Sequence, residues 1–259
     1  MDFLMLYQRS FLAGLLTAVA TALMGVHVVF RRMAFFGDAI AHVAFAAAAI
    51  GVTIGVSSFL SAVVLAVVAS LILAKLSRRN ISEDVSVGVL FSLTMAIGVI
   101  LFSLVKRQRN LMSYLFGDIL TVTDTDMFYL SIVTVSVIVY NLLFKDTLVQ
   151  FTFDEDFTKL MRPKIDLIYQ LFLAVLAITV VIGVRTVGVI LVSAFLIIPA
   201  ATASIGAKDY RKVFLFAPVL SSISVVVGLL LSLYMDVPPG ALIVVVQGAM
   251  FFTTIALRR

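Results

Sequence analysis

The chain alternates between long apolar runs and short clusters of charged residues. A membrane-spanning helix needs about 20 mostly apolar residues. Eight runs come close to that length or exceed it: 11–30, 57–76, 84–105, 126–144, 165–184, 187–205, 213–234 and 240–257. A ninth run, 34–52, is similar in length but contains Asp38 and His42.

These runs lack the alternation of a β-strand. Lipid offers no partner to unpaired backbone groups, which leaves only helices or closed barrels. The pattern therefore predicts an all-α, polytopic membrane helix bundle with about eight or nine transmembrane helices. No run of polar residues is long enough to form a linker, so residues 1–259 are expected to form a single transmembrane domain.

Composition supports the membrane assignment. The chain is 63% hydrophobic and 13% charged, with a mean hydropathy of +1.19, whereas soluble domains are about 45–50% apolar. The absence of cysteine excludes disulfides, thiolate ligands and cysteine nucleophiles. The first residues, MDFLMLYQRS, lack the features of a cleaved signal peptide and are expected to be retained.

The basic residues predict the orientation of the bundle. With nine spans and an external N-terminus, 14 of the 19 Lys and Arg residues lie on the cytoplasmic side; with eight spans and an internal N-terminus, 13 do. The positive-inside rule therefore favours nine spans slightly. Both arrangements place the C-terminus, 145–164 and 206–212 in the cytoplasm, and this distribution explains the net charge of +5 without a nucleic-acid partner.

The stretch FRRMAFFGDAIAH, residues 30–42, places Asp38 and His42 in an apolar segment. Residues four apart share one face of a helix. A carboxylate in hydrocarbon costs at least about 2.5–3.5 kcal/mol, so it needs a partner or a function. Carboxylate and imidazole together suit zinc, manganese or ferrous iron. The alternative is that Asp38 pairs with Arg31 or Arg32 while His42 is simply packed.

Two ligands do not complete a metal site, because zinc prefers four and manganese about six. A twofold homodimer would bring a second Asp38 and a second His42 to the axis. His27 could line the same path, but a packed or hydrogen-bonded position in the first span explains it more simply.

Two further segments are unusual. In SRRNISEDVSVG, residues 77–88, Ser82, Glu83 and Asp84 suit the start of a helix. In LVSAFLIIPAATASIGAKDYRK, residues 191–212, Pro199 precedes small residues and a charged end, which fits either a docking surface or an ordinary helical turn.

Four stretches together resemble the permease subunits of ABC-type metal-ion importers, which carry zinc, manganese or iron. They are FRRMAFFGDAIAH, YLFGDIL at 114–120, FDEDF at 153–157 and VGVILVSAFLIIPAATAS at 187–204. The resemblance covers nearly the whole chain in order. It implies a fold similar to the vitamin B12-type importer permeases, and a homodimer in the cytoplasmic membrane of a bacterium or archaeon.

The resemblance also implies partners and site residues. The expected partners are membrane lipid, two cytoplasmic ATP-binding subunits and an extracytoplasmic metal-binding protein. Asp38 and His42 would line the path of a transported Zn²⁺, Mn²⁺ or Fe²⁺ ion, with no permanently bound cofactor, and His27 has no counterpart in the family. The ATPase-docking residues would be Pro199, Ala200, Ala201, Ser204, Gly206, Lys208, Asp209, Arg211 and Lys212.

The implied function is ATP-driven import of a divalent transition metal; the alternative is a permease for a chelated metal, such as a siderophore or a corrinoid. The chain lacks G-x-x-x-x-G-K-[ST], so separate subunits must hydrolyse ATP. It also lacks the H-E-x-x-H pattern of zinc proteases. A transport subunit, and not an enzyme, is therefore expected.

Overall fold

A computed structural model describes residues 2–77, 81–104, 119–207, 209–235 and 237–258. These residues form helices and no strand. The elements are α1 (Asp2–Phe30), α2 (Phe36–Ile54), α3 (Ser58–Ser77), α4 (Glu83–Leu104), the short 3-10 helix η1 (Ile119–Thr121), α6 (Asp124–Phe153), α7 (Glu155–Met161), α8 (Ile165–Val187), α9 (Val189–Gly206), α10 (Tyr210–Met235) and α11 (Pro239–Leu257).

Nine of the described helices are long and apolar enough to cross a membrane, so the all-α prediction is confirmed and the segment at 34–52 is the ninth candidate span. One difference concerns the end of α6, since the apolar run in the sequence ended at residue 144. The helix continues through Lys145 and Asp146 to Phe153. Charges that end an apolar run do not end a helix, because outside the hydrocarbon water can solvate them.

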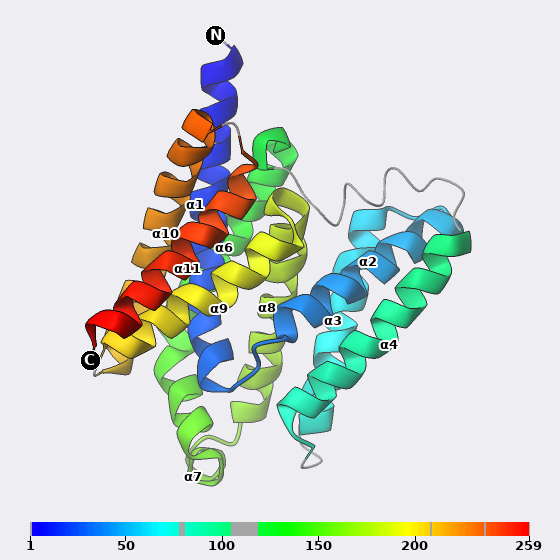
Figure 1. Ribbon diagram of the computed structural model, residues 1–259. Coiled ribbons are helices and arrows are strands. Elements are labelled where there is room, and N and C mark those ends of the chain that lie inside the picture. The colour runs from blue at the N-terminus through cyan, green and yellow to red at the C-terminus, as the bar shows by residue number, and fades with distance from the viewer. Residues whose placement is uncertain (1, 78–80, 105–118, 208, 236, 259) are drawn as a thin grey trace.

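Helix α1 lies inside the bundle and contacts α6, α8, α9 and α10 (Figure 1). Helices α2, α3 and α4 form a group that packs against α8, and α4 packs mainly on α2 and α3. The outer helices expose apolar side chains such as Val89 and Phe252. Such a surface is suited to lipid, which is as apolar as the side chains themselves.

Helix α9 passes close to both α1 and α2 at Leu196. A Cβ atom placed on Gly25 would lie 2.0 Å from the carbonyl oxygen of Leu196. A Cβ atom on Gly37 would lie 2.8 Å from the Cδ1 atom of the same leucine. Small residues allow helices to approach this closely in membranes. The two glycines therefore fix α9 against the first two helices.

A buried ion pair connects the ends of α1 and α4. The Nη2 atom of Arg31 lies 2.5 Å from Oε1 of Glu83, and Nε also donates to both carboxylate oxygens. The Tyr169 hydroxyl of α8 donates to Glu83 at 2.7 Å. The guanidinium lies over the rings of Phe151 and Tyr169, with its Cζ atom 4.9 and 4.4 Å from their centroids.

The environment of Arg31 keeps its guanidinium charged. Burial acts to lower the pKa of this group, but its interactions with Tyr169 and Glu83 outweigh burial and raise the pKa above the ordinary value. The side chains of Arg31 and Glu83 are only 10% and 14% exposed. Breaking such a pair leaves a charge without its partner in a place that water hardly reaches.

Gly25→Ala should destabilise the bundle, because the added methyl group must displace the backbone of Leu196. Overpacking of this kind costs about 1–3 kcal/mol or more. Thermal unfolding of the protein in detergent measures the effect. Gly248→Ala is the matched control, since a Cβ atom there has no neighbour within 4 Å. Equal unfolding temperatures for the two variants would contradict the close crossing.

Arg31→Ala should lower the free energy of unfolding by about 3–5 kcal/mol, the usual effect of removing one partner from a buried pair. Lys159→Ala, which breaks the exposed pair with Glu155, should change it by less than about 1 kcal/mol. Denaturant or thermal unfolding in detergent compares the two. Arg31→Lys should fall between them, because lysine keeps the charge but loses the bidentate contact.

Candidate functional site

Asp38 lies in the first turn of α2, where its side chain is half-buried. The Ser193 hydroxyl of α9 donates a hydrogen bond to Oδ1 of Asp38, with an O–O distance of 2.5 Å. Arg31 pairs with Glu83 instead, and no ion pair joins Asp38 to Arg32 among the described residues, so neither alternative pairing is present. The side chain of Asp38 therefore has a neutral hydrogen-bond partner.

His42 lies one turn further along α2 and is also half-buried. The edge of its ring faces Phe91 of α4, with the centroids 5.0 Å apart. Its Nδ1 atom is buried and has no hydrogen-bond partner in the described part of the chain. An imidazole and a carboxylate thus occupy successive turns of one helix face, as the spacing predicted, and neither is neutralised by an opposite charge.

One copy of the chain does not complete a metal site. Among the described residues, no three His, Cys, Asp or Glu side chains come together as they would around an ion. The two residues that the sequence predicts as ligands, Asp38 and His42, would be too few for zinc, which prefers four. One chain therefore does not present a complete set of ligands.

His27 is packed and hydrogen-bonded inside the bundle. It is fully buried in α1, and its Nε2–H donates to Oδ1 of Asn141 at 3.1 Å. The rings of Phe172 and Phe214 lie against it, with centroids 5.3 and 4.9 Å away. The amide of Asn141 donates in turn to the carbonyl oxygen of Val137. This histidine links α1 to α6, as the packed interpretation expected.

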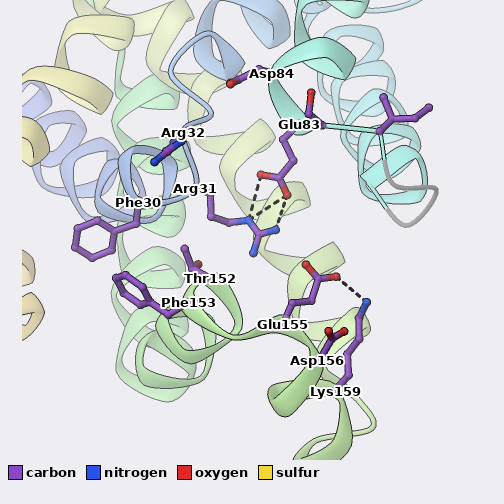
Figure 2. Close-up of a pocket in the computed structure, with 12 residues that line it drawn as sticks. Phe30, Arg31, Arg32, Glu83, Asp84, Thr152, Phe153, Glu155, Asp156 and Lys159 are labelled. Carbon is purple, nitrogen blue, oxygen red and sulfur yellow. Dashed lines mark hydrogen bonds and ion pairs between the residues drawn. The ribbon is translucent and has the colours of Figure 1, made fainter.

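The end of the bundle that carries α7 is called the α7 end. It has a hollow of about 900 Å³, which Figure 2 shows with Arg31 and Glu83 in contact on its wall. Charges of both signs line the hollow: Arg31, Arg32, Glu83, Asp84, Glu155, Asp156 and Lys159. Lys159 donates to Glu155 at 2.6 Å, and this hydrogen bond raises the pKa of the lysine. Glu83 and Asp84 do begin α4, as predicted.

The residues expected to dock an ATPase lie partly inside the bundle. Pro199 and Ala200 are buried within α9, whereas Ala201 and Ser204 are half-buried. The other residues lie at the α7 end: Gly206, Asp209, Arg211 and Lys212 are exposed, and Lys208 is outside the described residues. Most of YLFGDIL, residues 114–118, is also outside them. An exposed docking contact is therefore available only from 206 onward.

Helix α7 presents a second exposed surface at this end. Asp154 ends α6 and caps α7, since its carboxylate accepts from the backbone N–H of Phe157 at 3.0 Å. Phe157 and Leu160 are 56% and 82% exposed. Tyr210, at the start of α10, donates to Asp146 of α6 at 2.9 Å. This contact joins the α6 extension to the residues that follow Gly206.

Sequence reasoning missed two residues of this region. Glu83 was given only the role of starting a helix, and Ser193 was given no role. The partner of Glu83 is 52 residues away and that of Ser193 is 155 residues away. A signal for the ion pair of Glu83 was present in the sequence. Glu83 directly precedes the apolar run 84–105, and Arg31 directly follows the run 11–30, so both charges were expected at the ends of helices. A serine in an apolar run gives no comparable signal.

Comparison with known proteins supplies the family. The chain matches the ABC 3 transport family over residues 3–258. It is 36% identical over 245 residues to a probable metal transport system membrane protein of Thermotoga maritima, covering 94% of this chain and 87% of the relative. It is 29% identical over 249 residues to the high-affinity zinc uptake system membrane protein ZnuB of Haemophilus influenzae, covering 95% of each.

A solved structure agrees with the fold. PsaBC from Streptococcus pneumoniae, determined in complex with Fab, superposes with a TM-score of 0.82 and 28% identity. The superposition covers 96% of this chain and 90% of that chain. The resemblance carried by the four sequence stretches is therefore confirmed, and the chain belongs to the ABC 3 transport family.

Proposed function

We propose that the chain is the membrane-spanning subunit of an importer for a divalent transition-metal ion, namely Zn²⁺, Mn²⁺ or Fe²⁺. A member of the ABC 3 transport family is a transport subunit, and separate ATPase subunits provide the energy. The observation that carries the choice of a metal ion is the pair on α2. Asp38 and His42 lie one turn apart on this helix, and Asp38 is held by a neutral hydroxyl and not by a basic side chain.

A second copy of the chain would complete the site. Twofold symmetry would place two carboxylates and two imidazoles around one ion, which is enough for tetrahedral zinc or, with waters, for octahedral manganese or iron. A bulky chelate would have no use for two ionic ligands facing each other across an axis. This argument, together with relatives named for metal and zinc transport, favours a bare ion over the chelated alternative.

The α7 end faces the cytoplasm in this proposal, because the basic residues gather there, and the membrane is the cytoplasmic membrane of a bacterium or archaeon. An extracytoplasmic metal-binding protein delivers the ion at the opposite end. ATP binding closes the two ATPase subunits, the two copies of this chain rock against each other, and access to Asp38 and His42 alternates between the two sides.

The ATPase subunit docks on two neighbouring parts of the α7 end. One is the segment that begins at the end of α9, in which Gly206, Asp209, Arg211 and Lys212 are exposed. The other is α7, whose exposed Phe157 and Leu160 need a partner. From 145 to 153, α6 extends about 13 Å beyond the last apolar residue of its span, whereas the headgroup layer is only about 5–8 Å thick. Lipid therefore cannot cover α7, but a protein partner can.

Asp38→Ala and His42→Ala should each reduce metal uptake at least about tenfold, because each removes a ligand from the path. Uptake is measured in proteoliposomes that hold this chain, its ATPase and its binding protein, with zinc, manganese and iron offered separately. Asp84→Ala, which removes an exposed carboxylate at the start of α4, should transport normally. Full uptake by the Asp38 variant would place the path elsewhere in the bundle.

Leu160→Asp should reduce co-purification of the ATPase at least about tenfold, because a carboxylate would face the apolar surface of the partner. Joint replacement of Asp209, Arg211 and Lys212 by alanine should weaken it as well, whereas Lys159→Ala should not. The amount of ATPase that co-purifies with each of the three variants in a detergent pull-down measures the effect. Normal binding by the triple variant would restrict docking to α7 and show the assignment of 206–212 to be wrong.

A further inference from the structure

The hydrogen bond between Ser193 and Asp38 joins two helices that no sequence pattern connects. Ser193 lies one turn into α9, and Asp38 lies in the first turn of α2. The serine hydroxyl donates to Oδ1 of the carboxylate. Most hydroxyl groups in the membrane-spanning helices donate to a backbone carbonyl of their own helix, as Ser222 does to Pro218. Ser193 instead bonds a charged group on another helix.

A neutral hydroxyl such as that of Ser193 is a suitable hydrogen-bond partner for a carboxylate that binds a cation. A hydroxyl donor orients the carboxylate and occupies one lone pair of Oδ1, while the other oxygen stays available. The donor is neutral, so it does not compensate the negative charge of a carboxylate as a lysine or arginine partner would. Metal-binding carboxylates are themselves usually hydrogen-bonded, and such partners affect metal affinity strongly.

The packing around this contact keeps the two helices at the distance that it needs. Gly37 precedes Asp38, and a Cβ atom there would lie 2.8 Å from Leu196 and 3.6 Å from Oγ of Ser193. A methyl group at position 37 would therefore displace the Leu196 side chain, which packs at the crossing of α2 and α9. On its other side, the backbone of Leu196 contacts Gly25 of α1. The serine is thus supported by a rigid crossing and not by a loop.

We infer that Ser193 is a positioning residue for the Asp38 carboxylate and helps to set the affinity of the site for its metal ion. This inference rests on the proposed function, since it acts through a ligand that the proposal assigns. The serine does not touch the ion. It fixes the rotamer of Asp38 so that the free oxygen points in one direction when the ion arrives.

The test compares Ser193→Ala with Ser193→Thr in the complete transporter. Loss of a side chain that hydrogen-bonds a metal ligand typically reduces metal affinity about 10–100-fold, so Ser193→Ala should raise the KM for Zn²⁺ or Mn²⁺ uptake about tenfold or more, with a smaller change in kcat. Ser193→Thr keeps the hydroxyl and should restore most of the affinity. Ser222→Ala, whose hydroxyl bonds only its own helix, should leave the KM unchanged.

Two outcomes would overturn the inference: a wild-type KM for Ser193→Ala, or a Ser193→Thr variant as impaired as the alanine variant. A thermal unfolding temperature within a few degrees of wild type shows that Ser193→Ala is folded. Asp38→Ala separates this inference from the proposed function. If that variant loses uptake while Ser193→Ala does not, only the positioning role fails; if it transports normally, the proposed metal path fails.

Discussion

The close passage of α9 between α1 and α2 is the constraint on which the candidate site depends. Leu196 places its backbone against Gly25 and its side chain against Gly37. A Cβ atom on Gly25 would therefore have to move the backbone of α9, whereas one on Gly37 would displace the leucine side chain. One turn before this leucine, Ser193 reaches Asp38. In lipid, helices gain little from burying apolar surface against each other, and close packing of small residues supplies the specificity instead.

The carboxylates of the bundle have two kinds of partner, basic side chains and hydroxyl groups. Near its ends, opposite charges meet: Arg31 binds Glu83 at the α7 end, and Arg185 binds Asp126 at 2.7 Å at the opposite end. Inside α2, Asp38 accepts a hydrogen bond from the Ser193 hydroxyl and forms no ion pair within the described parts of the chain. An ion pair compensates the charge of a buried carboxylate, whereas a hydroxyl does not. The proposed metal path depends on this contrast.

Sequence patterns could predict the helices because lipid allows few alternatives. Apolar runs of spanning length determine the number of helices and their order, and the four-residue spacing places Asp38 and His42 on one face. The same patterns could not give the end of α6, since Lys145 and Asp146 stop the apolar run but not the helix. Nor could they give Ser193 or the partner of Glu83, because those contacts depend on how distant segments cross. The family resemblance implied that Pro199 and Ala200 contact the ATPase, but in the fold they are buried.

The 30-residue length of α6 has a consequence for the membrane in which the protein works. A helix of this length spans about 45 Å, whereas the hydrocarbon core is about 30 Å thick. With the boundary of the hydrocarbon core placed at Phe144, residues 145–153 form a stalk towards α7, and the length of this stalk outside the core depends on the local thickness of the bilayer. A thicker bilayer would shorten the stalk and draw α7 towards the lipid surface. Membrane thickness thereby becomes a physical variable that controls how accessible this end of the protein is.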